Sequence, residues 1–199
     1  VVDPINGIVD PSLMLEGLNT LYFEIGEGTC FNQDSLILEI LPLPAMDPGL
    51  DIGVCGNLQP ITFDDFDPLG GTWEGPGIID GTTGTFDPEI GTGNYTAIYF
   101  FTDALTGCTD TVQRVIDVHP VPEAIGVVDP EACTNLNLDV QNNSLGATTY
   151  LWDFGNMETS GFIVPAYTYP TAGDYTITLV AYNDFSCSDT TTFEVEAID

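Results

Sequence analysis

The five cysteines are the residues of this 199-residue chain whose spacing points most directly to chemistry. Cys55 and Cys108 are 53 residues apart, Cys133 and Cys187 are 54 apart, and a tryptophan stands between the members of each pair. The order Cys, Trp, Cys is typical of a disulfide that joins the two sheets of a β-sandwich, with the tryptophan packed on it. The sequence therefore predicts two disulfides, Cys55–Cys108 and Cys133–Cys187, and an oxidising compartment.

Cys30 is left without a partner in this scheme. It occupies the same place relative to its surroundings as Cys108 and Cys187, so its partner is expected in sequence upstream of this segment. A reactive free thiol is the alternative. A zinc site is disfavoured, because the chain contains no CxxC motif and its one histidine, His119, cannot complete a ligand set.

The charge balance is strongly acidic, with 31 Asp and Glu residues, one arginine and a formal net charge of −30. Such a chain repels nucleic acid and anionic membrane, since phosphate binding needs clustered Lys and Arg. Without any lysine, it cannot form Lys–Asn cross-links or Schiff bases. The acidity either keeps an extracellular protein soluble or provides calcium sites. Asp64, Asp65 and Asp67 form the densest carboxylate cluster and are the candidate calcium ligands.

Catalytic motifs do not assemble in this sequence. The chain contains no GxSxG, no HExxH and no phosphate-binding loop. Carboxylates are abundant, but a glycosidase site needs two of them facing one cleft, which two separate sandwiches do not supply. We therefore expect this segment not to be an enzyme, and calcium is the one cofactor to consider.

The elements that position these residues are repeats of about 78 residues. Cys30 is followed 12 and 14 residues later by prolines, and so is Cys108; Cys30 precedes Cys55 by 25 residues, as Cys108 precedes Cys133. This spacing predicts three units: the C-terminal half of a repeat at 1–45, a complete sandwich at 46–121 and another at 122–199. The segments 41–44 and 119–122 contain alternating prolines and are expected to be stiff, extended connectors.

Period-two alternation of apolar and polar residues predicts strands at 136–140, 175–182 and 192–197. Gly and Pro together number 35, which suits the many turns of an all-β fold. No run of 18 apolar residues is present, so no membrane insertion is expected. The predicted fold class is all-β, with tandem immunoglobulin-like sandwiches in a linear array.

Residues 150–182 resemble the PKD domain, an immunoglobulin-like sandwich. The family pattern is approximately WDFGDG, then HxY, then GxYxVxLxV. This chain has Trp152-Asp153-Phe154-Gly155-Asn156, then Tyr167-Thr168-Tyr169, then GDYTITL from residue 173. Asn156 and Met157 replace the usual Asp-Gly, so the turn there is expected to differ. The resemblance covers most of 122–199 and implies a PKD-like sandwich.

Residues 70–118 resemble the companion immunoglobulin-like repeat of large surface adhesins from Bacteroidetes-type bacteria, including gliding-motility adhesins exported by the type IX secretion system. The matching pieces are GGTWEGPG from residue 70, GTFDP from residue 84, GNY from residue 93 and GCTD from residue 107. Proteins of that group carry O-glycans on Asp-Ser/Thr-aliphatic or -Thr tripeptides. The resemblance thus implies candidate glycosylation at Ser35, Thr111 and Thr190; ordinary strand-start chemistry is the alternative.

Two functions follow as hypotheses. The first is a structural segment of an extracellular adhesin, stalk or filament. Its partners would be neighbouring repeats of the same chain, or other copies in a filament, and surface ligands would be bound by a domain outside this segment. The second is an accessory carbohydrate- or protein-binding module of a secreted enzyme. A solvent-facing Trp73 or Tyr99 would favour the binding module, whereas buried tryptophans would favour the stalk. A third route, completion of 1–45 by strand exchange with another chain, would make the protein self-assembling.

Overall fold

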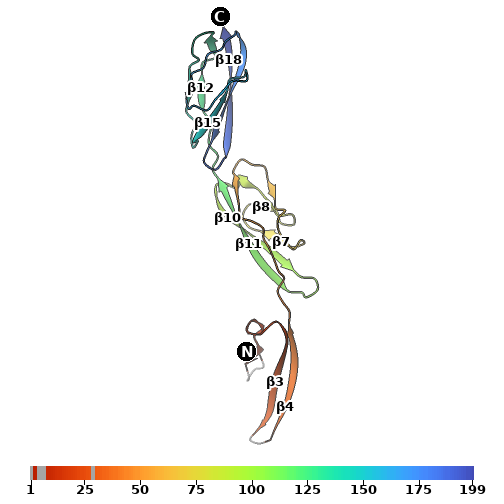
Figure 1. The fold of residues 1–199 in the computed structure, drawn as a ribbon. Helices are drawn as coiled ribbons and strands as arrows, with labels where there is room; N and C mark the ends of the chain where they lie inside the picture. The colour runs from red at the N-terminus through yellow and green to blue at the C-terminus, as the bar shows by residue number, and fades with distance from the viewer. Residues whose placement is uncertain (1, 4–7, 28–29) are drawn as a thin grey trace.

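The computed structural model describes residues 2–3, 8–27 and 30–199. Three β-rich bodies follow one another along an elongated molecule, with the C-terminus at the far end of the last body (Figure 1). The helical content of the described residues is two short 3-10 turns, η1 (Pro11–Leu13) and η2 (Pro88–Ile90). The predicted all-β fold with tandem sandwiches is therefore confirmed.

The N-terminal body is a long hairpin with a small two-stranded addition. Strand β3 (Gly17–Glu27) pairs antiparallel with β4 (Cys30–Ile40), and β1 (Val2–Asp3) pairs with β2 (Ile8–Val9). Several large apolar side chains of the hairpin are exposed, among them Leu18, Tyr22, Phe23, Leu36 and Ile37. A hairpin with an uncovered apolar surface is what the C-terminal half of a sandwich would look like, and the half-repeat at 1–45 stays a prediction.

The middle body is a two-sheet sandwich. One sheet has the order β5 (Ile52–Cys55), β11 (Thr109–His119), β10 (Gly93–Thr102) and β7 (Thr72–Glu74). The other has the order β6 (Ile61–Thr62), β9 (Thr85–Phe86) and β8 (Ile78–Asp80). Alternate residues of β10 and β11 point inward and form a core with residues of the other strands: Val54, Phe63, Trp73, Phe86, Ala97, Tyr99, Ile116 and Val118.

The C-terminal body repeats this plan. Its larger sheet has the order β13 (Glu131–Cys133), β18 (Ser188–Ile198), β17 (Gly173–Tyr182), β15 (Thr149–Asp153) and β16 (Thr159–Ser160). Strands β12 (Gly126–Val128) and β14 (Val140–Asn142) form the facing sheet. The core contains Leu138, Val140, Trp152, Phe154, Tyr169, Ile177, Leu179 and Val195, with two alanines.

The three long hairpins share one register. In each, the glycine that opens the first strand pairs with the residue ten positions after the hairpin's cysteine: Gly17 with Ile40, Gly93 with Val118 and Gly173 with Ala197. In each sandwich the second hairpin strand also pairs in parallel with a short strand that ends in a cysteine, β5 in one and β13 in the other. The spacing repeat in the sequence is thus a repeat of backbone pairing.

The predicted strands at 175–182 and 192–197 are confirmed by β17 and β18, whose inward residues Ile177, Leu179 and Val195 are buried. The strand predicted at 136–140 is wrong over most of its length, because β14 begins only at Val140. Leu138 is buried, but its amide donates to the carbonyl of Tyr167 across the core edge instead of to a strand ladder. Leu136 is 63% exposed.

Candidate functional site

The two cysteines of each sandwich lie at opposite ends of it. Cys55 ends β5 opposite His119, whereas Cys108 immediately precedes Thr109, the first residue of β11. The 11 residues of β11 therefore separate them, which at about 3.3 Å per residue is roughly 35 Å. A disulfide requires Cα atoms within about 7 Å. The predicted Cys55–Cys108 pair is therefore wrong.

The second predicted pair fails for the same reason. Cys133 ends β13 opposite Ile198, and Cys187 immediately precedes β18, which runs from Ser188 to Ile198. The whole of β18 separates the two sulfurs, so Cys133–Cys187 is also wrong. The Cys, Trp, Cys order suggested an inter-sheet bond, but these cysteines sit at strand ends and not on the facing sheets.

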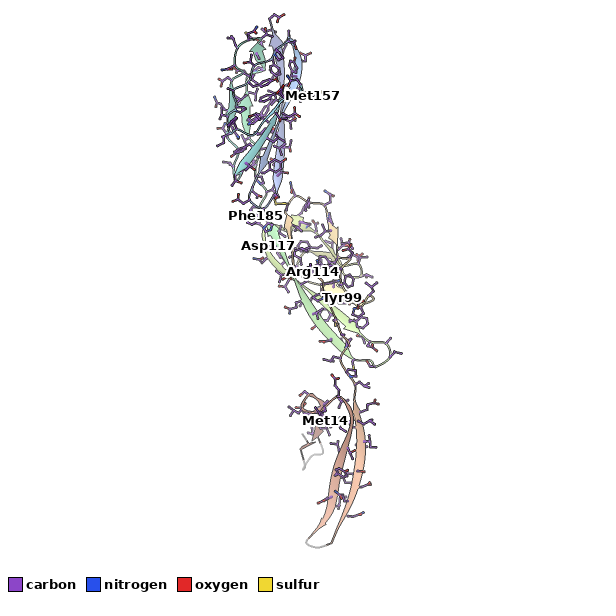
Figure 2. All side chains as sticks on the ribbon, viewed as in Figure 1. Met14, Tyr99, Arg114, Asp117, Met157 and Phe185 are labelled. Carbon is purple, nitrogen blue, oxygen red and sulfur yellow. A yellow bond between two sulfur atoms is a disulfide. The ribbon has the colours of Figure 1, made fainter. Side chains whose placement is uncertain are left out.

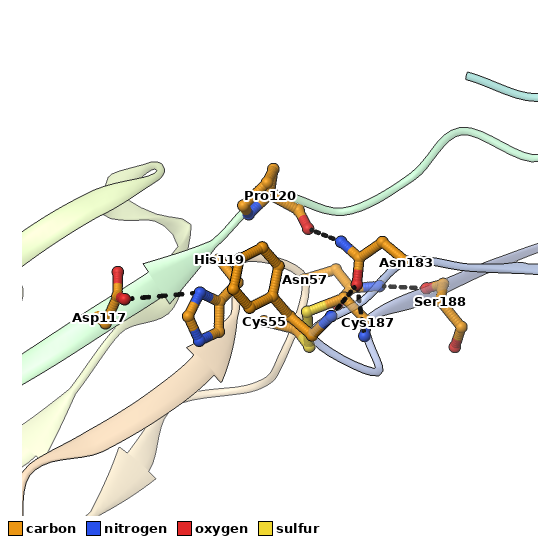
Figure 3. The surroundings of a disulfide bond; sticks show 9 residues. Cys55, Asn57, Asp117, His119, Pro120, Asn183, Cys187 and Ser188 are labelled. Atoms are coloured by element: carbon orange, nitrogen blue, oxygen red, sulfur yellow. Dashed lines mark hydrogen bonds and ion pairs between the residues drawn. A yellow bond between two sulfur atoms is a disulfide. The ribbon is translucent and has the colours of Figure 1, made fainter. Parts of the chain in front are cut away.

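The disulfide that the structure contains joins the two sandwiches. Cys55 of the middle sandwich is bonded to Cys187 of the C-terminal one, with a Cα–Cα distance of 5.5 Å and a sequence separation of 132 (Figure 3). Cys187 is 1% exposed. The bond lies where the end of β5 meets the turn between β17 and β18, so it fixes the end of one sandwich to the end of the next.

Polar and aromatic contacts surround this disulfide. The Asn57 side-chain amide donates to the carbonyl of Ser188 at 3.1 Å, which adds a second link between the sandwiches. The His119 imidazole stacks on the Phe185 ring, with centroids 4.1 Å apart and planes 10° apart. The junction therefore combines a covalent bond and a hydrogen bond, both drawn in Figure 3, with a ring stack.

Asn183 braces the turn that carries Cys187. Its side-chain oxygen accepts from the amides of Phe185 and Cys187, both at 3.0 Å, and its side-chain amide donates to the carbonyl of Pro120 at 2.7 Å. One side chain thus holds both the cysteine turn and the connector between the sandwiches. Asp103 accepts from the amides of Leu105 and Thr106 in the corresponding turn of the middle sandwich.

Two of the remaining cysteines are free thiols. Cys108 is half-buried and Cys133 is exposed. Cys30 opens β4, and its side chain lies outside the described residues, so the prediction of an upstream partner for it stays a prediction. Among the described cysteines, each sandwich therefore carries one bonded and one free sulfur, at opposite ends.

The aromatic residues that could have formed a binding platform are interior. Trp73 is 1% exposed, Tyr99 0% and Trp152 0%. The Tyr99 hydroxyl donates to the carbonyl of Pro68 at 2.6 Å and accepts from the amide of Gly71 at 2.8 Å, so its polar end is satisfied inside the fold. Figure 2 shows Tyr99 within the middle body. These rings stabilise the cores and do not face a ligand.

The predicted calcium cluster does not form. The Asp65 carboxylate turns inward to pair with the Arg114 guanidinium and also accepts from the amide of Leu50. Asp67 uses its backbone to pair with Asp47 in an isolated bridge. In the described part of the chain, no group of three His, Cys, Asp or Glu side chains is placed to hold a metal ion. The prediction that Asp64, Asp65 and Asp67 together bind calcium is therefore wrong, because the fold directs Asp65 to Arg114 and does not bring the three carboxylates together as a ligand set.

Arg114 is a buried residue that sequence reasoning did not place. It lies on β11 within the middle body (Figure 2) and is 3% exposed. Its guanidinium carbon lies 4.5 Å from the centroid of the Phe63 ring, and its guanidinium bonds the Asp65 carboxylate. The hydrogen bond from Arg114, with that from the Leu50 amide, lowers the pKa of Asp65 below its ordinary 3.8. The one base in the chain thus serves the interior of the middle sandwich. Its inward position on the alternating strand β11 was the available signal.

The candidate glycosylation residues lie on strands. Ser35 on β4, Thr111 on β11 and Thr190 on β18 are all exposed. The carboxylates before Ser35 and Thr111 accept from the backbone amides of those residues, at 2.8 and 2.7 Å. The positions are accessible to a transferase, and modification stays a prediction.

Among the described residues, the structure has no helix long and apolar enough to cross a membrane.

The sequence did not predict the three junction residues Asn183, Phe185 and His119. Their positions in the sequence could have indicated a role at the junction, because His119 begins the proline connector and Phe185 lies two residues before Cys187.

Comparison with known proteins gives relatives for the C-terminal part. The chain is 48% identical over 80 residues to the pre-pro-metalloprotease PrtV of Vibrio cholerae, a match that spans 40% of this chain and 9% of that protein. Among solved structures, the PKD1 domain of V. cholerae PrtV is 32% identical, with 40% of this chain and 99% of that chain covered and a TM-score of 0.36. The PKD1 domain of Vibrio anguillarum Epp is 28% identical, with 39% and 94% covered and a TM-score of 0.35.

The family comparison agrees with the resemblance seen in the sequence motifs. The matched segment contains the connector at 119–122 and nearly the whole C-terminal sandwich. This segment is less than half of the chain. Residues 117–197 match the PKD domain family.

Proposed function

We propose that this chain is a structural segment of a long extracellular bacterial surface protein, an adhesin stalk or filament built from stapled sandwiches. The observation that carries the proposal is the Cys55–Cys187 bond between the two sandwiches. A disulfide within a domain would stabilise that domain alone. A disulfide between domains removes the hinge motion that a connector would otherwise allow, and so favours a rod.

Two further properties of the chain support a rod. The connector at 119–122 contains two prolines, and Asn183 anchors the carbonyl of Pro120. The net charge of −30 makes the bodies repel one another at low salt, which favours extended over collapsed arrangements. The buried aromatic residues, including Trp73 and Tyr99, argue against an exposed sugar-binding platform in this segment.

Small-angle X-ray scattering of the oxidised and reduced chain tests the mechanical part of this proposal. A stapled junction gives one stable maximum dimension in the oxidised sample, and reduction broadens the distribution of distances between the sandwiches. Cys30, Cys108 and Cys133 are replaced by Ser in this sample, so that Cys55–Cys187 is the one bond that reduction breaks, and the Cys55→Ser variant, which lacks that bond before reduction, is the matched control. Identical scattering before and after reduction would show that the disulfide does not restrain the junction.

Immunogold electron microscopy of the source cells, with antibody to this segment, tests the cellular part. Labelled fibres on the cell surface, with a repeat near the length of one sandwich, are the expected result. One sandwich is roughly 35 Å long, since its longest strands have 11 residues. Label confined to compact particles in the culture medium would contradict the proposal.

A second candidate is an accessory module of a secreted enzyme. The observation that favours it is the 48% identity to part of the metalloprotease PrtV, of which this chain spans 9%. The same immunological reagent separates the two candidates: co-purification of the labelled protein with a protease activity would favour the accessory module, and fibres without activity would favour the stalk.

A further inference from the structure

The free thiols of the two sandwiches correspond to the two halves of the junction disulfide. Cys133 ends β13, which pairs in parallel with β18, as Cys55 ends β5, which pairs in parallel with β11. Cys108 closes the turn before β11, and its carbonyl accepts from the amide of Asp103. Cys187 closes the turn before β18, and its carbonyl accepts from the amide of Asn183. Each sandwich therefore has a strand-end cysteine at one end and a turn cysteine at the other.

The bond that exists joins unlike types: a strand-end cysteine of one sandwich with the turn cysteine of the next. Cys133 is a strand-end cysteine without a turn partner, and Cys108 is a turn cysteine without a strand-end partner. They lie at the two outward ends of the stapled pair, because Cys55 and Cys187 occupy the inward ends.

We propose that Cys133 and Cys108 are junction cysteines, each of which forms a disulfide with a cysteine of the opposite type on the next copy of this repeat in line. The inference deepens the proposed rod and rests on it, since it makes the inter-sandwich staple a feature of every junction. Asn135 supports the equivalence: it follows Cys133 by two residues, as Asn57 follows Cys55 and bonds Ser188 across the existing junction. The following repeat would thus meet Cys133, and the preceding one Cys108.

The chemistry is a two-electron oxidation by a disulfide oxidant, RSSR, of small-molecule or protein type. The thiolate of one cysteine attacks RSSR, forms a mixed disulfide and releases RS⁻. The second cysteine's thiolate attacks the mixed disulfide at the first cysteine's sulfur, forms the new S–S bond and releases a second RS⁻. The two thiol protons end on the leaving thiolates, so two RSH are produced for each junction bond.

The test uses the full 199-residue chain with Cys30→Ser, which leaves Cys108 and Cys133 as the thiols outside the Cys55–Cys187 bond. The protein is held near 1 mM, about the effective concentration that a short connector provides, with glutathione disulfide as oxidant. The expected product is a ladder of covalent multimers on a non-reducing gel, with steps of one 21.3 kDa chain, which collapses on reduction.

Two single variants show whether unlike types pair. Cys108→Ser retains only the strand-end thiol and Cys133→Ser only the turn thiol, so each alone should stay monomeric while an equal mixture gives a heterodimer. Pepsin digestion in acid, which prevents disulfide exchange, should release a peptide that joins Cys133 to Cys108. Trypsin is unsuitable, because Arg114 is the only Lys or Arg.

Two results would overturn the inference: dimerisation of Cys108→Ser alone to the same extent as the mixture, or a mixture that stays monomeric while Cys55–Cys187 is intact. Neither result would contradict the proposed rod, which fails only if the Cys55–Cys187 bond does not restrain the two sandwiches. The same digestion of protein from source cells separates the two origins of the partner. A joined peptide from a different repeat identifies the neighbour in line, and one with both halves from this segment identifies a second copy.

Discussion

Removal of either half of the junction disulfide should destabilise both sandwiches. When the middle sandwich unfolds beside a folded C-terminal one, the chain from Cys55 to the connector at Pro120 is a closed loop, since both ends are attached to the folded neighbour. When the C-terminal sandwich unfolds instead, the chain from Pro122 to Cys187 is closed in the same way. Each loop has about 65 residues, and closure of a loop of that size is worth about 4 kcal/mol in the chain-entropy model.

Measured disulfide contributions often fall short of this model, so we expect Cys55→Ser and Cys187→Ser each to lower the stability of each sandwich by about 2–4 kcal/mol. For domains of this size that corresponds to a fall of roughly 10–25 °C in the unfolding midpoint. Differential scanning calorimetry measures both transitions. Tryptophan fluorescence assigns each transition to a sandwich, because Trp73 lies in the middle core and Trp152 in the C-terminal core. Replacing one of the two tryptophans by Phe leaves the fluorescence of the other to follow its own sandwich.

The two variants together distinguish the observed pairing from the one predicted by spacing. If the bonds lay within the sandwiches, Cys55→Ser would affect only the middle transition and Cys187→Ser only the C-terminal one. With the bond between the sandwiches, both variants should give the same profile. Cys108→Ser and Cys133→Ser are the controls and should stay within about 0.5 kcal/mol of the parent chain. A C-terminal transition that is unmoved by Cys55→Ser would refute the reasoning.

Arg114→Met should lower the stability of the middle sandwich by about 2 kcal/mol, as measured by urea unfolding. The loss is smaller than for a fully buried ion pair, because the Asp65 side chain is 40% exposed, and an unchanged unfolding midpoint would contradict the prediction. Because the pKa of Asp65 is lowered on folding, its stabilisation is fully present above pH 3.8 and is lost as pH falls through the lower folded value. Asp65→Asn should therefore lower the free energy of unfolding at pH 7, and its difference from the parent chain should shrink below pH 3.8. A difference that stays constant down to pH 2 would refute the stabilising role of the Asp65 carboxylate. Tyr169→Phe leaves the carbonyl of Phe154 without its donor and should cost the C-terminal sandwich about 1–2 kcal/mol while the middle transition stays fixed.

The β-strands and the repeat could be predicted because their signals are local. Alternation over 175–182 and 192–197 reflects one buried face of a strand, and the alternation survives as the inward row of β17 and β18. At 136–140 the same pattern misled, because the Leu138 side chain is buried in the core while its backbone amide bonds the carbonyl of Tyr167 and takes no part in a strand ladder. Burial and strand pairing usually coincide, but alternation reports only burial.

The disulfide pairing and the role of the charges depended on the tertiary structure. Cysteine spacing gives the length of chain between two sulfurs but not the end of the sandwich at which each one lies. The 11 residues of β11 and of β18 place the cysteines of one sandwich too far apart to bond and bring Cys55 to Cys187. Carboxylate density likewise suggested calcium, whereas the fold turns Asp65 to the buried Arg114. The sequence by itself determined which residues alternate and repeat, and only the packing of whole sandwiches determined which distant side chains meet.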